Sequence, residues 1–94
     1  MYFALTGKIT HILDGKVVIN VNNVSYKVLV AHDQDFSLNE VTTIYTHYVI
    51  REDEQYLVGF KNLDEKKAFL SLINVKGIGP KTAINALSAT TAKE

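Results

Sequence analysis

The spacing of apolar residues changes once along the chain, near Lys61, and this change constrains the fold more than any other feature. From residue 3 to residue 60, β-branched and aromatic residues come in short runs separated by turn-forming residues. After Lys61 the apolar residues recur every three or four positions, which is the spacing of an amphipathic helix. The sequence therefore predicts a β domain over residues 1–62 and a helical unit over residues 63–94.

The β domain is predicted to contain five strands. Asp14-Gly15 and Asn22-Asn23 are typical of tight turns, and a longer polar segment over residues 33–40 precedes the fourth strand. The predicted strands span residues 2–13, 16–21, 25–31, 42–50 and 55–60. Five short antiparallel strands with one longer connection are typical of a small closed barrel of the oligonucleotide-binding (OB) type. We therefore expect a mainly β fold, a five-stranded OB-fold barrel followed by a small helical appendage.

The helical unit is predicted to be two helices joined by a turn. Asn62 and Glu65 have the spacing of a capping box, which starts a helix. This helix is predicted to end near Val75 and to bury one apolar stripe, formed by Phe69, Leu72 and Ile73. A second helix is predicted from Pro80 to about Leu87. Two helices of this length cannot enclose a core alone, so they must pack on the barrel, on another copy or on residues outside this chain.

The segment between the helices, residues 75–83, has the composition of a phosphate-binding turn. Gly77 and Gly79 can adopt φ > 0 and allow another backbone to come close, while a proline suits the first position of the second helix. Unpaired amides at the start of that helix, with the positive end of its dipole, attract an anion. The predicted phosphate-binding residues are Gly77, Gly79, Lys81, Thr82 and Lys76. The alternative is that this segment merely closes an ordinary helical hairpin.

The connection between the fourth and fifth strands is acidic, and we call its residues, Arg51-Glu52-Asp53-Glu54, the acidic tip. Such a charge run is usually a solvated turn. A catalytic role is disfavoured because carboxylates at a strand tip diverge, and the sequence offers no second set of ligands for a two-metal centre. A third interpretation is electrostatic, in which the tip repels nucleic-acid strands that are bound elsewhere on the protein.

The net charge of the chain is zero, but the charges are unevenly distributed. Residues 1–60 carry four basic and seven acidic side chains, a net charge of −3, whereas residues 61–94 carry six lysines and three acidic side chains, a net charge of +3. A net charge of zero argues against non-specific binding of nucleic acid. The positive charge nevertheless lies on the unit that contains the predicted phosphate site.

Several classes of site and location are disfavoured by the composition. The chain has no cysteine, and its three histidines, His11, His32 and His47, are scattered without the spacing of metal ligands. We therefore expect no metal, no cofactor and no catalytic residue. The chain also has neither a secretory signal nor a long apolar run, so a cytoplasmic protein without membrane contact is expected.

Aromatic residues offer a second way to bind nucleic acid, because they can stack on unpaired bases. The candidates are Tyr26, Phe36, Tyr45, Tyr48, Tyr56 and Phe60. In the predicted strands, Tyr56 shares a face with Val58, and Tyr48 shares a face with Ile50. This pattern favours one buried face over an exposed stacking row.

With both the glycine segment and the acidic tip in place, the chain resembles the N-terminal part of the RuvA family of bacterial Holliday-junction-binding proteins. The resemblance covers nearly all of the chain. It is carried by Leu5-Thr6-Gly7-Lys8-Ile9, by Thr46-His47-Tyr48-Val49-Ile50-Arg51-Glu52-Asp53 with Leu57-Val58-Gly59-Phe60, and by Gly77-Ile78-Gly79-Pro80-Lys81. Their order and spacing are specific to this family.

The resemblance implies a homotetramer that holds the four duplex arms of a DNA junction in an open square. Helix-hairpin-helix motifs would grip the DNA backbone, which assigns Gly77, Gly79 and Lys81 the role inferred above. Glu52 and Asp53 would form an acidic pin at the crossover, whereas Glu54 is an additional carboxylate whose role in the pin is open. The motor would be a separate RuvB-type ATPase, and the chain itself has no Walker A motif.

The family also has a second helix-hairpin-helix and a C-terminal domain that contacts the motor, and both would lie beyond Glu94. The chain is therefore expected to be a fragment that grips duplex DNA less tightly and does not stimulate the motor. The leading hypothesis is sequence-independent binding of four-way junctions. A single-strand-binding module, or an oligomerisation core with little affinity for DNA, are the alternatives.

Overall fold

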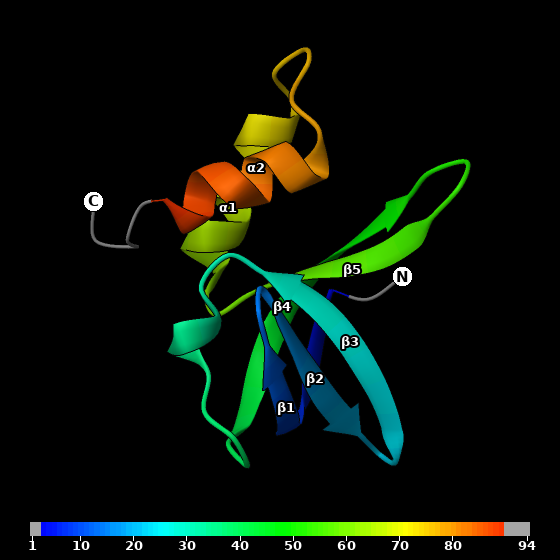
Figure 1. The fold of residues 1–94 in the computed structure, drawn as a ribbon, viewed down its shortest axis with the longest axis vertical. Coiled ribbons are helices and arrows are strands. Elements are labelled where there is room, and N and C mark those ends of the chain that lie inside the picture. The colour runs from blue at the N-terminus through cyan, green and yellow to red at the C-terminus, as the bar shows by residue number, and fades with distance from the viewer. Residues whose placement is uncertain (1–2, 90–94) are drawn as a thin grey trace.

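The structure is a computed structural model that describes residues 3–89. The barrel lies at one end of the molecule, and the two helices lie at the other end (Figure 1). The hairpin of the fourth and fifth strands extends past the barrel, beside the helices. In chain order the elements are β1 Ala4–Leu13, β2 Lys16–Val21, β3 Val24–Val30, the 3-10 helix η1 Asp33–Asp35, β4 Val41–Ile50, β5 Gln55–Phe60, α1 Leu63–Ile73 and α2 Pro80–Ser88.

The strands close into a barrel in the order β1-β2-β3-β5-β4, and β4 pairs back onto β1. This order is that of an OB-type barrel, so the predicted mainly β fold with a helical appendage is confirmed. The expectation that all strands are antiparallel is wrong for one pair, because β3 and β5 are parallel and align Val28 with Leu57. The long excursion through η1 and β4 returns the chain to the edge of β3 in the same direction.

The strand boundaries agree with the prediction to within one residue for β2 to β5. The predicted start of the first strand at Tyr2 lies outside the described residues. The turn between β2 and β3 is tight because Asn22 and Asn23 adopt φ values of 50° and 70°. In the turn between β1 and β2, Gly15 adopts a φ of 73°, and its amide donates to Oδ2 of Asp33 over 2.8 Å.

The interior of the barrel is one apolar core to which every strand contributes. Its buried residues are Leu5, Ile9, Val17, Ile19, Val28, Val30, Phe36, Ile44 and Leu57. Gly59, on β5, faces this core. A Cβ at this position would lie 2.4 Å from Cγ1 of Val28 and 2.5 Å from Cγ2 of Ile44, so only glycine fits without displacing them.

A second core lies between the outer face of the β4–β5 hairpin and the two helices. Its buried residues are Val49, Val58, Phe60, Phe69, Ala83 and Ile84. The hairpin therefore packs on both faces, and the prediction of a single buried face is wrong. Ile50, which was predicted to be buried with Tyr48, is 60% exposed because the hairpin extends past the end of the barrel at this position.

The two helices begin where the sequence predicts, and they pack on the hairpin. Oδ1 of Asn62 accepts a hydrogen bond from the amide of Glu65 over 2.8 Å, which confirms the N-cap. The reciprocal half of the capping box is absent among residues 3–89, because the Glu65 side chain binds His32 instead. Within the predicted stripe, Phe69 is fully buried, and Leu72 and Ile73 are partly buried.

Helix α1 ends at Ile73, slightly before the predicted position, and α2 covers Pro80–Ser88. No helix within residues 3–89 is long and apolar enough to cross a membrane.

Candidate nucleic-acid interface

The connection between the helices, residues 74–79, is a tight turn that we call the glycine turn. The amide of Ile78 donates to the carbonyl of Val75 over 3.0 Å, and Gly77 adopts a φ of 89°. This left-handed conformation explains the glycine at position 77. The expectation of φ > 0 is wrong for Gly79, whose φ is −90° and ψ is 171°. No atom outside the neighbouring residues lies within 4 Å of a Cβ built on either glycine, so both leave open space on the surface.

The N-terminus of α2 presents unpaired amides to solvent. Pro80 occupies the first turn of this helix, and the first helical hydrogen bond runs from the amide of Ala83 to the carbonyl of Gly79 over 2.9 Å. Within the part of the chain that the structure describes, the amides of Lys81 and Thr82 have no acceptor. Both side chains are exposed. Such an arrangement attracts anions, because the amides point outward along the positive end of the helix dipole.

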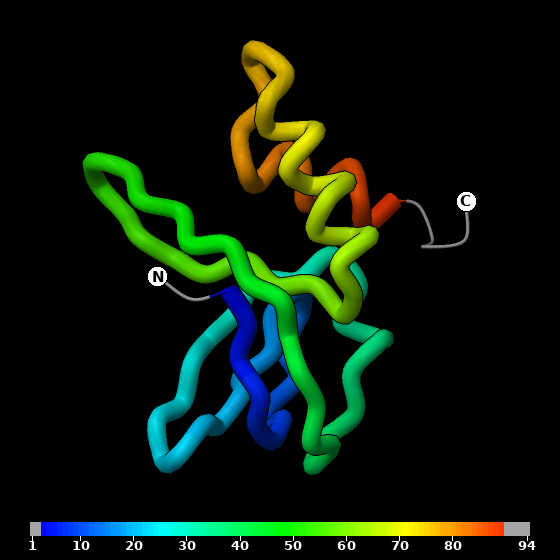
Figure 2. The backbone as a smooth tube through the Cα atoms, turned by 180° about the vertical axis from the view of Figure 1, so that it is seen from behind, coloured from blue at the N-terminus to red at the C-terminus, as the bar shows by residue number. Residues whose placement is uncertain are grey.

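The acidic tip lies at the end of the β4–β5 hairpin. The amide of Arg51 donates to the carbonyl of Glu54 over 2.9 Å, which closes the turn directly after the pair formed by Ile50 and Gln55. The side chains of Glu52 and Asp53 are exposed. Seen from either side, the acidic tip and the glycine turn project beyond the same end of the barrel (Figure 2).

The structure connects the acidic tip to the start of α2, two features that are far apart in the sequence. Nζ of Lys81 lies 3.3 Å from Oε1 of Glu54, and it also lies 5.2 Å from the ring centroid of Tyr56. Residues from the tip and from α2 line a shallow recess of about 340 Å³, and Arg51 and Thr82 lie among them. Basic and acidic groups therefore lie side by side at this end of the molecule.

The contribution of Glu54 and Tyr56 was missed by the sequence reasoning. A signal for Tyr56 was present, because it shares a strand face with Val58 and Phe60, which both pack against the helices. Glu54 carried no comparable signal. Its contact depends on where α2 lies relative to the hairpin, which no local pattern encodes.

The net charge of +3 on residues 61–94 is only partly available at this interface. Nζ of Lys61 donates to Oε2 of Glu40 over 3.0 Å, and this hydrogen bond lowers the pKa of the Glu40 carboxyl. Nζ of Lys66 lies 4.1 Å from the ring centroid of Phe3, and burial lowers the pKa of Lys66. In contrast, Lys76 lies exposed at the glycine turn, and Lys81 lies exposed at the start of α2, where it pairs with Glu54.

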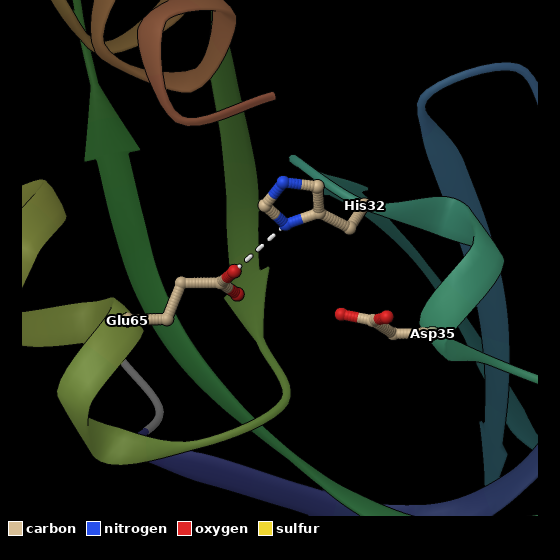
Figure 3. A group of neighbouring side chains, drawn as sticks. All are labelled: His32, Asp35 and Glu65. Carbon is tan, nitrogen blue, oxygen red and sulfur yellow. Dashed lines mark hydrogen bonds and ion pairs between the residues drawn. The ribbon is translucent and has the colours of Figure 1, made fainter. Parts of the chain in front are cut away.

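Three side chains that could ligate a metal lie together elsewhere, between the barrel and α1: His32, Asp35 and Glu65 (Figure 3). Their ligand atoms lie within 4.8 Å of one another. Nδ1 of His32 donates to Oε2 of Glu65 over 2.9 Å, and both side chains are less than one tenth exposed. We interpret this pair as a structural contact that fastens α1 to the end of β3, because the two groups already satisfy each other.

The six aromatic candidates, all within the described residues, do not form an exposed stacking surface. Phe36 and Phe60 are buried, and the four tyrosines among the candidates are partly buried. Of these, Tyr26 and Tyr48 pack against the barrel core, whereas Tyr56 packs against the second core. Phe3 is the most exposed aromatic ring within residues 3–89, and it packs edge-on against Tyr45 with the Lys66 ammonium over it.

Comparisons with known proteins give a consistent result. The family model of the RuvA N-terminal domain matches residues 1–59, which correspond to the barrel. The chain is 45% identical over 86 residues to proteins named Holliday junction branch migration complex subunit RuvA from Streptococcus pyogenes serotype M18 (strain MGAS8232) and serotype M49 (strain NZ131). Each alignment covers 89% of this chain and 43% of the relative, so the chain spans less than half the length of these proteins.

Proposed function

The chain belongs to the RuvA N-terminal domain family, and from this premise we propose that it binds four-way DNA junctions by their structure and without reading their sequence. In this proposal it is the non-motor subunit of a branch-migration complex in recombination and DNA repair. The observation that carries the proposal is the exposed N-terminus of α2, with two unpaired amides and Lys81, beside a hairpin tip of exposed carboxylates. Phosphate contacts of this kind position DNA and carry no sequence information.

The residues of the site have two proposed roles. Gly77, Gly79, Lys81 and Thr82 would hold one phosphate of the DNA backbone, and Lys76 would add a second positive charge nearby. Glu52 and Asp53 would repel the backbone at the crossover and so keep the strands apart. The two roles require the glycine turn and the acidic tip to lie on the same side of the barrel, and both project there (Figures 1 and 2).

We further propose a division of labour between units and between proteins. The barrel domain would end at residue 62, and the helix-hairpin-helix would begin at residue 63. The protein would act in the cytoplasm as a homotetramer, with ATP hydrolysis supplied by a RuvB-type motor and none by this chain. Subunit contacts would cover some of the large apolar side chains that are more than half exposed, namely Val24, Leu38, Val41 and Ile50.

A mobility-shift competition tests the proposed function. A labelled four-way junction is bound to the protein and challenged with unlabelled junction, linear duplex or single strand at several salt concentrations. We expect the junction to compete best. Equal competition by linear duplex would overturn junction specificity, and stronger competition by single strands would favour a single-strand-binding module.

Two further measurements separate the remaining possibilities. Sedimentation with and without junction DNA measures the mass of the assembly, and a tetramer is expected. An assembly that shifts no form of DNA would leave an oligomerisation core as the function. ATP turnover by the purified chain would contradict the proposal that the chain is not an enzyme.

A further inference from the structure

The ion pair between Lys81 and Glu54 occupies the lysine that the proposed phosphate site depends on. Nζ of Lys81 lies 3.3 Å from Oε1 of Glu54, and the two side chains are 59% and 43% exposed. Among residues 3–89, neither Glu52 nor Asp53 forms an ion pair, although both lie in the same turn. The three carboxylates of the acidic tip are therefore not equivalent, because only Glu54 engages the start of α2.

The contact of Lys81 with Tyr56 differs from its ion pair with Glu54, because it uses none of the hydrogen-bond donors of the ammonium group. The Tyr56 ring attracts the ammonium through its π face at 5.2 Å from the centroid and accepts none of its hydrogen bonds. A phosphate can therefore replace the carboxylate while the ring contact persists. Exposed ion pairs are weak, whereas a phosphate at this position would also receive hydrogen bonds from the amides of Lys81 and Thr82.

We propose that Glu54 is a positioning residue that competes with DNA phosphate for Lys81, so that the lysine is held against the hairpin in the free protein and transferred to the DNA backbone on binding. This inference rests on the proposed function and assigns Glu54 a role distinct from that of Glu52 and Asp53. Because DNA must displace the Glu54 carboxylate from Lys81, the protein binds DNA less tightly than it would without Glu54.

The test replaces Glu54 with glutamine and measures affinity for linear duplex and for a four-way junction over a range of salt concentrations. We expect Glu54→Gln to raise the affinity for both by about two- to fivefold at low salt, which is the scale of one exposed ion pair. The slope of log affinity against log salt should become steeper by at most about one, since DNA binding no longer frees a carboxylate that takes up a cation.

Glu52→Gln is the matched control. It removes the same charge two residues from Glu54, at a side chain that forms no ion pair within residues 3–89. Each substitution is also made together with Lys81→Met. The gain from Glu54→Gln should disappear in the Lys81→Met background, whereas a gain from Glu52→Gln should persist there. This coupling distinguishes competition for Lys81 from the general effect of removing a negative charge.

The outcomes separate this inference from the proposed function. A gain from Glu54→Gln that survives in the Lys81→Met background would overturn the role of Glu54 and leave junction binding intact. Binding by Glu54→Gln but not by the unmodified chain would support the competition and contradict junction binding by the chain as it stands. If neither protein shifts any form of DNA, both proposals are wrong.

Discussion

The imidazole of His32 donates a hydrogen bond from Nδ1 to Oε2 of Glu65 over 2.9 Å, and this bond joins the barrel to the first turn of α1. The pair lies almost completely out of solvent. Its partners are more than 30 residues apart in the chain, so the bond helps to fix the helices relative to the barrel.

His32→Ala should therefore destabilise the protein by about 1–3 kcal/mol, because it leaves the Glu65 carboxylate without its partner in a buried position. Denaturation in urea, followed by circular dichroism, measures the change in the free energy of unfolding. Lys67→Ala, at an exposed position of the same helix, should change this free energy by no more than about 0.5 kcal/mol. Equal stability of the two variants would mean that the bond contributes nothing.

The stability should also decrease in mild acid because of His47. Burial lowers the pKa of His47 below its usual value of 6.5, and the nearby charge of Lys66 lowers it further. The folded protein therefore binds a proton at His47 less readily than the unfolded chain does. The contribution of the neutral ring is fully present above pH 6.5 and is lost as the pH falls through the pKa of the folded state.

The measurement is the free energy of unfolding as a function of pH for the unmodified chain and for His47→Gln. The variant should show a shallower decrease below pH 6.5, because glutamine does not titrate. His11→Gln serves as the matched control, because it makes the same substitution at an exposed histidine. Identical pH profiles for all three proteins would show that His47 does not control the stability.

Gly79→Asp should separate folding from DNA binding. Gly79 is the N-cap of α2 with extended backbone angles, and aspartate is one of the residues favoured at such positions. The variant should be at least as stable as the unmodified chain. It should nevertheless bind junction DNA at least about tenfold more weakly, because its carboxylate would occupy the proposed phosphate site and repel the backbone.

Gly79→Ser is the matched variant, because serine also caps helices but carries no charge. It should retain most of the junction binding, as measured in the same mobility-shift assay. If Gly79→Asp binds as tightly as Gly79→Ser, the N-terminus of α2 does not contact phosphate.

Reversing the charge of the acidic tip should change the preference for junction over linear duplex more than it changes the stability of the fold. Glu52→Lys combined with Asp53→Lys places two ammonium groups where the structure has exposed carboxylates. We expect a tighter complex with linear duplex and a smaller preference for the junction, with a stronger dependence on salt. The doubly neutral variant, Glu52→Gln with Asp53→Gln, should lie between the unmodified chain and the double lysine variant in its affinity for linear duplex and in its preference for the junction. A junction preference that stays the same across this series would identify the acidic tip as a plain solvated turn.

The sequence was sufficient to predict the barrel and both helices because their signals are local. Strand runs, turn dipeptides and the cap at Asn62 each depend on residues close together in the chain, and each is confirmed. The errors arise where a residue has a choice of partners. Glu65 binds His32 and not its own helix end, and the strand face that carries Ile50 loses its cover where the hairpin leaves the barrel.

The candidate site was predictable in its parts but not in their arrangement. The composition of the glycine turn and of the acidic tip was visible in the sequence, and the left-handed conformation of Gly77 is confirmed. The contact between Lys81 and Glu54 was not predictable, because it arises only after α2 packs on the outer face of β5. A contact that forms only when two elements pack together leaves no repeating pattern in the sequence from which it could be predicted.

The two-faced hairpin of β4 and β5 has a mechanical consequence. The same two strands form part of the barrel and pack against both helices. The acidic tip and the glycine turn are therefore both supported by this hairpin. Bending this hairpin would swing both elements together and would keep the gap between them nearly constant. Lengthening the hairpin by one pair of residues would instead move the acidic tip outward past the helices. The length of the hairpin therefore sets the distance between the acidic tip and the glycine turn.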